Sequence, residues 1–194
     1  MKKLPLFFII CFSITAFGQK IKLVEGDLAP LKGQPSVSLE MTYDGTRVGK
    51  FDKEADYIAQ KVSDYNAKES GKGDAWAKSW EDDKVSRFKP RFTEMFSERA
   101  FPIKDGSTYT VIFNTTFIEP GFNVGVMRRN ALINGEALIV ETKNKSKVIA
   151  KITVEKAPGR TFGGYDYDTG VRIQESYAMA GRELGDFIKS KLKK

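Results

Sequence analysis

The stretch ALINGEALIVETKNKSKVIAKITV, residues 131–154, decides the fold. Its second half alternates apolar and polar residues, with the apolar set at Val148, Ala150, Ile152 and Val154. This alternation is typical of a strand with one buried face, and residues 131–142 are its expected hairpin partner, joined by a turn at 144–146. Gly135 is either a bulge or the centre of an Asn134-Gly135 turn, and we favour the bulge.

Further strands are expected upstream of this hairpin. Val37, Leu39, Met41 and Tyr43 alternate with polar neighbours before Asp44-Gly45. Apolar residues alternate again over 109–117. Residues 119–122 then supply the proline and glycine of a type II turn.

Three amphipathic segments predict helices. In the first, apolar residues recur every three or four positions over 51–65, with Asp52 as the expected N-cap and Gly71 and Gly73 beyond the end. A second helical stretch begins at Asp74 and is expected to kink or break at Pro90. The third is the C-terminal helix, whose apolar face comprises Ile173, Tyr177, Ala180, Gly181, Leu184, Ile188 and Leu192. We expect Ala180 and Gly181 to let this helix lie close against the sheet.

The order of these segments predicts an α+β fold. We expect an antiparallel or mixed sheet of about four to five strands, with helices packed mainly on one face. Residues 36–194 would form this single domain. Residues 19–35, which mix charges with glycine and proline, are expected to be a tether or early loop.

The N-terminus has the three parts of a secretory signal peptide. Lys2 and Lys3 precede the apolar run 4–12, which is too short for a membrane anchor of about 20 residues. Small residues at Ala16 and Gly18 predict cleavage before Gln19. Export to the periplasm or outer envelope is therefore expected. A lipid anchor at Cys11 is not, because lipoprotein signals place a small residue where this chain has Ile10.

Composition excludes several kinds of chemistry. The chain has no histidine, and its one cysteine, Cys11, lies in the predicted signal peptide. Ordinary zinc sites, Ser-His triads and Cys-His dyads are thereby excluded, and we expect no cofactor and no metal. The formal net charge is +7, of which Lys2 and Lys3 contribute two. Nucleic acid is not an expected partner, because no basic groove with interleaved aromatic residues is evident.

Residues 159–170 form the most unusual segment, because they combine glycines with a cation, aromatic rings and carboxylates. We take this loop as the candidate partner-binding site, with no catalytic residues assigned. Two alternatives stay open: a purely structural loop that caps the last helix, and a calcium site built on the alternate aspartates. The candidate binding residues are Arg160, Phe162, Tyr165, Asp166, Tyr167 and Asp168.

Three other clusters have plainer interpretations. Trp76 and Trp80 are one helical turn apart, and we expect them to cover the sheet as core residues rather than to form a ligand platform. Residues 81–83 are all acidic, but consecutive helix positions point in different directions and cannot share one ion. The basic end could make a weak contact with an anionic membrane surface through Lys189, Lys191, Lys193 and Lys194.

Two runs of this sequence resemble a known family. The runs IEPGFNVGVMRRNALINGEALIVE (118–141) and GRTFGGYDYDTGVRIQESYAMAGRELGDFI (159–188) look like a family of small secreted proteins of Bacteroidota-type bacteria. The order of elements is also similar to that of α/β modules in envelope lipoproteins. The resemblance covers roughly residues 100–190. It implies a compartment and a fold, and it assigns no active residues.

Three functions follow from these observations, in order of preference. The first is an exported, non-enzymatic envelope or periplasmic module that binds a macromolecule, either an envelope protein or a glycan. The second is a carrier of an apolar small molecule between sheet and helices, which would require a large dry cavity. The third is a glycan hydrolase with two carboxylates about 5–10 Å apart in a cleft.

Overall fold

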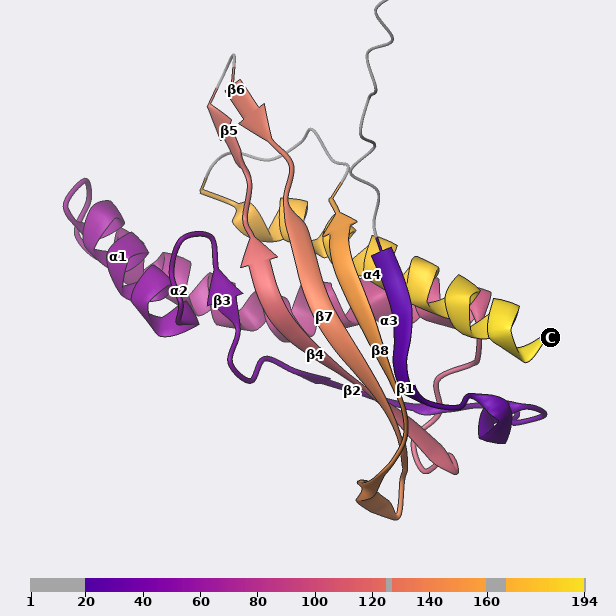
Figure 1. Cartoon of the computed structure of the whole chain (residues 1–194). Coiled ribbons are helices and arrows are strands. Elements are labelled where there is room, and N and C mark those ends of the chain that lie inside the picture. The colour runs from indigo at the N-terminus through magenta and orange to yellow at the C-terminus, as the bar shows by residue number, and fades with distance from the viewer. Residues whose placement is uncertain (1–19, 125–126, 160–166, 194) are drawn as a thin grey trace, which may run out of the picture.

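The computed structural model describes residues 20–124, 127–159 and 167–193, which form a sheet with helices on one face (Figure 1). The six-stranded sheet has the order β1-β8-β7-β4-β2, with β3 also paired to β4. Its strands are β1 (Lys20–Gly26), β2 (Ser38–Thr42), β3 (Arg47–Val48), β4 (Tyr109–Glu119), β7 (Leu132–Glu141) and β8 (Asn144–Pro158). The pairs within β1-β8-β7-β4 are antiparallel, whereas β2 and β3 run parallel to β4. The α+β prediction is confirmed, with a mixed sheet.

The helical part comprises four α-helices. These are α1 (Glu54–Asn66), α2 (Lys72–Asp83), α3 (Lys89–Arg99) and α4 (Thr169–Leu192). Helices α3 and α4 pack side by side across one face of the sheet, while α1 and α2 lie beyond its β3 side (Figure 1). Among the described residues, no helix is long and apolar enough to span a membrane.

The N-terminal segment corrects one prediction. Residues 19–35 were expected to be a tether or loop, but β1 pairs with β8, for example Ile21 with Val154. A 3₁₀ helix, Ala29–Leu31, follows it, and Leu28 and Leu31 are buried in the core. The charged residues of β1 are why the sequence did not indicate a strand here. Lysine is common in edge strands because its charge discourages pairing with strands of other molecules.

The central hairpin is present, with two refinements. Glu141 pairs with Asn144, so the turn is at Thr142 and Lys143 rather than at 144–146. Gly135 is not the centre of a turn, because β7 continues through it, but the expected bulge is not in β7 itself: the register against both neighbouring strands shifts opposite Gly135. The extra residues lie in the neighbouring strands. Lys156 of β8 has φ 57°, and its backbone N–H donates to Asn134 Oδ1 at 2.7 Å.

Several element boundaries differ from the predicted ones. The N-cap of α1 is Lys53, with no side-chain cap, and Asp52 instead forms an exposed ion pair with Arg47. Gly71 and Gly73 lie beyond α1, as predicted, but α2 begins at Lys72 rather than at Asp74, so Gly71 is its N-cap and Gly73 lies in its first turn. At 119–122 the chain does not reverse, because β4 is followed by β5 of a second hairpin that continues beyond the main sheet (Figure 1).

Aromatic side chains fill the space between sheet and helices. Phe88 stacks on Tyr177 of α4 with ring centroids 4.7 Å apart, and Phe92 of α3 contacts Phe113 of β4 at 4.6 Å. All four side chains are fully buried. Gly181 permits the close approach of α4 to α3 rather than to the sheet, since a Cβ there would overlap the carbonyl oxygen of Phe92. Ring burial of this kind is a large part of the hydrophobic stabilisation of a core.

The two tryptophans are core residues, as predicted, but they do not cover the sheet. Trp76 and Trp80 are each 2% exposed. They pack against Tyr57 of α1, with centroid distances of 5.7 Å and 5.2 Å. Trp80 also donates from Nε1 to Glu54 Oε1 at 2.6 Å. The indoles therefore join α1 to α2.

Candidate functional site

A π-helical segment, Lys84–Phe88, links α2 to α3 without a loop. Pro90, in the first turn of α3, has no N–H and cannot continue an α-helical hydrogen-bond ladder through this region. The predicted interruption is thus a widened turn placed just before the proline. Such π-helical insertions occur often at functional sites, because they redirect side chains that a regular helix would space evenly.

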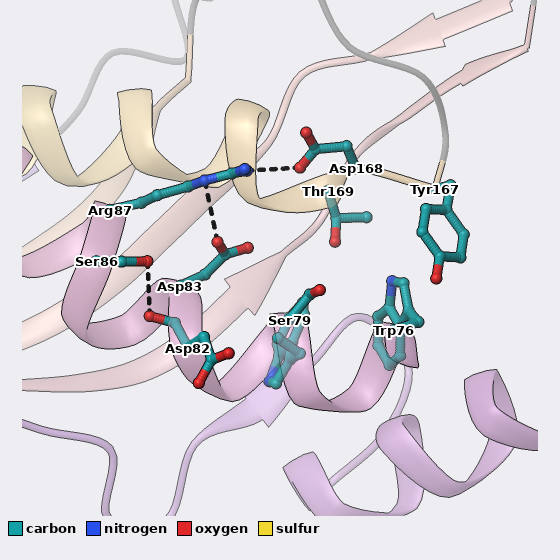
Figure 2. Close-up of a pocket in the computed structure, with 10 residues that line it drawn as sticks. Trp76, Ser79, Asp82, Asp83, Ser86, Arg87, Tyr167, Asp168 and Thr169 are labelled. Carbon is teal, nitrogen blue, oxygen red and sulfur yellow. Dashed lines mark hydrogen bonds and ion pairs between the residues drawn. The ribbon is translucent and has the colours of Figure 1, made fainter. Parts of the chain in front are cut away.

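Arg87, on this segment, connects two carboxylates from different elements (Figure 2). Its Nε lies 3.1 Å from Asp83 Oδ1 at the end of α2, and its Nη1 lies 2.6 Å from Asp168 Oδ1. Asp168 is the N-cap residue of α4. The hydrogen bond that Arg87 donates to Asp168 is the main reason that the pKa of Arg87 is raised. The guanidinium therefore fastens the beginning of α4 to the π-helical segment.

Asp83 is the buried member of this trio. Burial raises the pKa of its carboxyl from 3.8 to about 6, and the nearby carboxylates of Asp168 and Asp82 add to the rise. Arg87 opposes the shift without cancelling it. The carboxylate rests against Gly170 in the first turn of α4. Burial therefore makes Asp83 a weaker acid than an ordinary aspartate.

A pocket of about 370 Å³ lies beside this ion-paired trio. In Figure 2, Arg87 and Asp83 lie on the left, Trp76 and Tyr167 lie on the right, and Asp168 lies between them above Thr169. The hydroxyl of Ser79 points toward the space between Trp76 and Thr169 (Figure 2). The pocket is lined by Trp76, Ser79, Trp80, Asp82, Asp83, Ser86, Arg87, Tyr167, Asp168 and Thr169. Carboxylates, hydroxyls and aromatic rings together provide both polar and apolar contacts for a ligand.

A second, more open pocket of about 690 Å³ shares Tyr167 and Asp168 with the first. Its other lining residues come from the α1–α2 connection and the start of α2. Tyr167 is fixed between the two pockets: its hydroxyl donates to the carbonyl oxygen of Lys72 at 3.1 Å, and its ring contacts Tyr65 at 5.1 Å. Residues 167–168 thus form the partition between the two hollows.

The predicted recognition loop is only partly described. Arg160, Phe162, Tyr165 and Asp166 lie outside the described residues. Tyr167 and Asp168 are described, and the structure places both at the two pockets. The calcium alternative rested on Asp166 and Asp168, and Asp168 is paired with Arg87. Within the described ranges, no group of three or more histidine, cysteine or acidic residues could hold a metal ion.

Sequence reasoning missed the other half of this site. Asp83 and Arg87 were not singled out as a pair, although their i, i+4 spacing favours an ion pair on one helix face. The acidic run 81–83 does diverge, as predicted. Asp83 is buried against α4, while Glu81 is exposed and pairs with Lys84 at 2.9 Å.

The basic end lies on the last turns of α4. Lys189, Lys191 and Lys193 are exposed, and Lys194 falls outside the described residues. The ammonium of Lys191 lies 5.3 Å from the ring of Phe187. These lysines are far along α4 from the pocket, which adjoins the first turn of the helix (Figure 1).

Comparison with known proteins identifies no relative. No family model matches the chain, and no curated protein matches it. Among solved structures, the PelC dodecamer from Paraburkholderia phytofirmans aligns with a TM-score of 0.37 and 8% identity, over 84% of this chain and 97% of that chain. A Xanthomonas campestris protein of family DUF330 aligns with a TM-score of 0.33 and 12% identity, over 84% and 90%. Similarity at this level assigns neither a fold family nor a function.

Proposed function

We propose that this protein is an exported, non-enzymatic module of the bacterial envelope or periplasm that binds a macromolecular partner. The partner is an envelope protein or a glycan, and it contacts the pocket between α2 and the first turn of α4. The observation that carries this proposal is the position of Tyr167 and Asp168. Of the candidate binding residues in the predicted recognition loop, these two are the ones that the structure describes, and they line both pockets.

The chemistry of the pocket suits recognition better than catalysis. Hydroxyl and carboxylate oxygens at Ser79, Ser86 and Asp82 can accept hydrogen bonds from an amide or a sugar hydroxyl. Trp76 and Tyr167 offer apolar contact beside them. Side-chain interactions hold the pocket walls in place. Arg87 pairs with Asp168, and the Tyr167 hydroxyl donates to the backbone of α2. A preorganised site of this kind loses little conformational entropy on binding.

The two alternative functions fit less well. An apolar carrier needs a dry cavity between sheet and helices, and in the described core that space is filled by stacked rings such as Phe88 and Tyr177. A two-carboxylate glycan hydrolase would use Asp83 and Asp168, because Asp83 has the raised pKa of a general acid. Arg87, however, bonds to both carboxylates at once. The guanidinium occupies the position between them that a sugar ring would need.

A capture experiment with a pocket-filling variant tests the proposal. Ser79 is exposed at the pocket, so Ser79→Arg would fill it without disturbing the core. Ser63→Arg, on the exposed face of α1, is a matched control. Immobilised wild-type protein and both variants would be incubated with solubilised envelope protein and, separately, with envelope polysaccharide.

We expect the same species to be retained by wild type and Ser63→Arg and to be lost with Ser79→Arg. Equal retention by all three proteins would place the binding surface elsewhere. Turnover of the retained glycan by wild type, abolished in Asp83→Asn, would instead support the hydrolase.

A further inference from the structure

A short ribbon of two strands projects from the end of the main sheet (Figure 1). It consists of β5 (Phe122–Val124) and β6 (Met127–Arg129), which pair only with each other in an antiparallel register. We call this element the β5–β6 ribbon. It continues β4 and β7 but forms a separate sheet. A two-stranded ribbon of this length is marginally stable in water by itself.

Gly121 fixes the base of the ribbon. Its φ is +65°, and a Cβ there would overlap the carbonyl oxygen of Arg129 on the opposite strand. The two strands therefore approach closely where they leave the main sheet, as only glycine allows. The ribbon therefore extends the sheet and holds its outermost described residues, Val124 and Met127, away from the rest of the protein.

Those outermost residues are apolar and exposed. Val124 and Met127 are directly paired, and they are 50% and 61% exposed. Large apolar side chains that are exposed in this way number only five among the described residues, and the other three are scattered over Val24, Val85 and Val148. Single exposed apolar residues are ordinary, whereas these two are cross-strand neighbours and form one continuous exposed apolar surface.

The residues immediately behind this pair are basic. Arg128 is exposed on one face of the ribbon. Arg129 shares the other face with Val124 and Met127, and its side chain stays 64% exposed although it lies 3.5 Å from Glu119. The ribbon therefore has an apolar end and a cationic base, arranged along its length.

We propose that the β5–β6 ribbon inserts Val124 and Met127 into the surface of an anionic lipid bilayer, with Arg128 and Arg129 at the level of the head groups. Each strand residue rises about 3.3 Å, so Arg128 and Arg129 lie about 3 and 7 Å behind Met127, and with these arginines among the head groups the apolar pair would reach the boundary of head groups and acyl chains. Basic residues near such a surface are attracted to its negative charge, and salt weakens this attraction. Insertion would also remove the exposed apolar side chains of Val124 and Met127 from water.

This surface is distinct from the basic end of α4. The ribbon lies at the end of the molecule where α4 begins, whereas Lys189, Lys191 and Lys193 lie at the opposite end of this 24-residue helix (Figure 1). Helix α4 is about 36 Å long. The two surfaces can therefore be tested separately. The inference also stands apart from the pocket, since no ribbon residue lines it.

Co-sedimentation with vesicles tests the proposal. The purified exported protein would be mixed with vesicles of phosphatidylcholine alone or of phosphatidylcholine with phosphatidylglycerol, at low and high salt. We expect binding to the anionic vesicles that weakens with salt. The double variant Val124→Asp/Met127→Asp should bind at least tenfold more weakly, and Arg128→Gln about fivefold more weakly at low salt.

Val85→Asp is the matched control, because Val85 is 74% exposed on the π-helical segment and lies outside the ribbon. Thermal melts would verify that every variant is folded. Met127→Trp adds a direct probe, since an indole that enters the bilayer shifts its fluorescence to shorter wavelength. The proposal is overturned if wild type does not bind anionic vesicles at low salt. It is equally overturned if Val85→Asp lowers binding as much as the ribbon variants do, or if only replacement of Lys189, Lys191 and Lys193 by glutamine removes binding.

Discussion

The carboxylate of Asp83 occupies the space that a side chain at Gly170 would need. Asp83 ends α2, and Gly170 lies in the first turn of α4, so this contact brings together two elements that are far apart in the sequence. Arg87 then pairs with Asp83 and with Asp168, beside Gly170. The missing side chain at position 170 is therefore what allows an acid to be buried against the start of α4.

Gly170→Ala should destabilise the protein through this contact. The added methyl group would push the Asp83 carboxylate away from Arg87, and overpacking of this kind costs about 1–3 kcal/mol. In an Asp83→Ala background the same change should cost little, because the two nearest atoms are then gone and the third, Nη1 of Arg87, is the end of a flexible side chain that can move. Urea unfolding of wild type, both single variants and the double variant would measure the coupling energy. Additive effects of the two substitutions would contradict this account of Gly170.

Gly181→Ala is a reference for the comparison of Gly170→Ala with and without Asp83. A Cβ at 181 would meet the backbone carbonyl of Phe92, which cannot rotate away as a carboxylate can. The loss should exceed that of Gly170→Ala, even though alanine favours helices over glycine by about 1 kcal/mol. It should also be unaffected by Asp83→Ala.

The fold was largely predictable because the apolar residues in most of its helices and strands recur at regular spacing. The apolar face of the last helix and the alternation at 148–154 both indicate one buried side, which α4 and β8 have except at Val148, where the side chain is 42% exposed. The first strand was missed because Ile21 and Leu23 give only two apolar positions between charges. The local sequence also does not indicate which neighbouring element a small residue contacts. Gly181 was therefore predicted to lie against the sheet, whereas it lies against α3.

The candidate site was only half predictable for a similar reason. Tyr167 and Asp168 belong to a segment whose composition is unusual in itself. Asp83 and Arg87 look like an ordinary surface pair on a helix, and their role depends on α4 returning beside them after some 80 residues. Burial of Asp83 is a tertiary effect, and no local signal encodes it.

Stability should depend on the protonation of Asp83. Its pKa is about 6 in the folded protein and 3.8 as an ordinary value, so between about pH 4 and 6 the folded state holds more protons than the unfolded state. The free energy of unfolding contributed by this group therefore falls as pH rises through that window, by up to about 3 kcal/mol, and no further above it.

Urea unfolding of wild type and Asp83→Asn at pH 4.5, 5.5 and 7 checks this prediction. The difference between the two proteins isolates Asp83 from the other acids. As pH rises from 4.5 to 7, the free energy of unfolding of wild type should fall relative to that of Asp83→Asn. Asp105→Asn is the control, because Asp105 is exposed in the loop before β4 and does not contribute to the pKa shift of Asp83, so its removal should leave that part of the pH dependence unchanged. A wild-type profile that Asp83→Asn does not alter would show that Asp83 is not a buried titrating acid.

Leu184 tests the packing of α4. Its side chain is fully buried in the core, so Leu184→Ala should lower the free energy of unfolding by about 2–5 kcal/mol. Lys193→Ala, on the same helix but exposed, should leave it almost unchanged. Thermal or urea unfolding of the two variants would show whether the last helix is integral to the fold. Equal, small effects would mean that it is not.

Export predicts a specific N-terminus. If residues 1–18 are a signal peptide, the protein isolated from the periplasm or envelope should begin at or within a few residues of Gln19. N-terminal sequencing or intact-mass measurement would determine this. Retention of Met1 or Lys2 in the isolated protein would rule out a cleaved signal.

The central claim is that a partner contacts the pocket beside Arg87, and cross-linking in the living cell tests it most directly. A photoreactive phenylalanine analogue would be introduced at position 79, inside the pocket, and at position 63, on the exposed face of α1. Such probes insert into C–H bonds and so capture protein and glycan alike. We predict a discrete covalent adduct from position 79 and none from position 63. No adduct from position 79, or the same adduct from both positions, would contradict the proposed binding site.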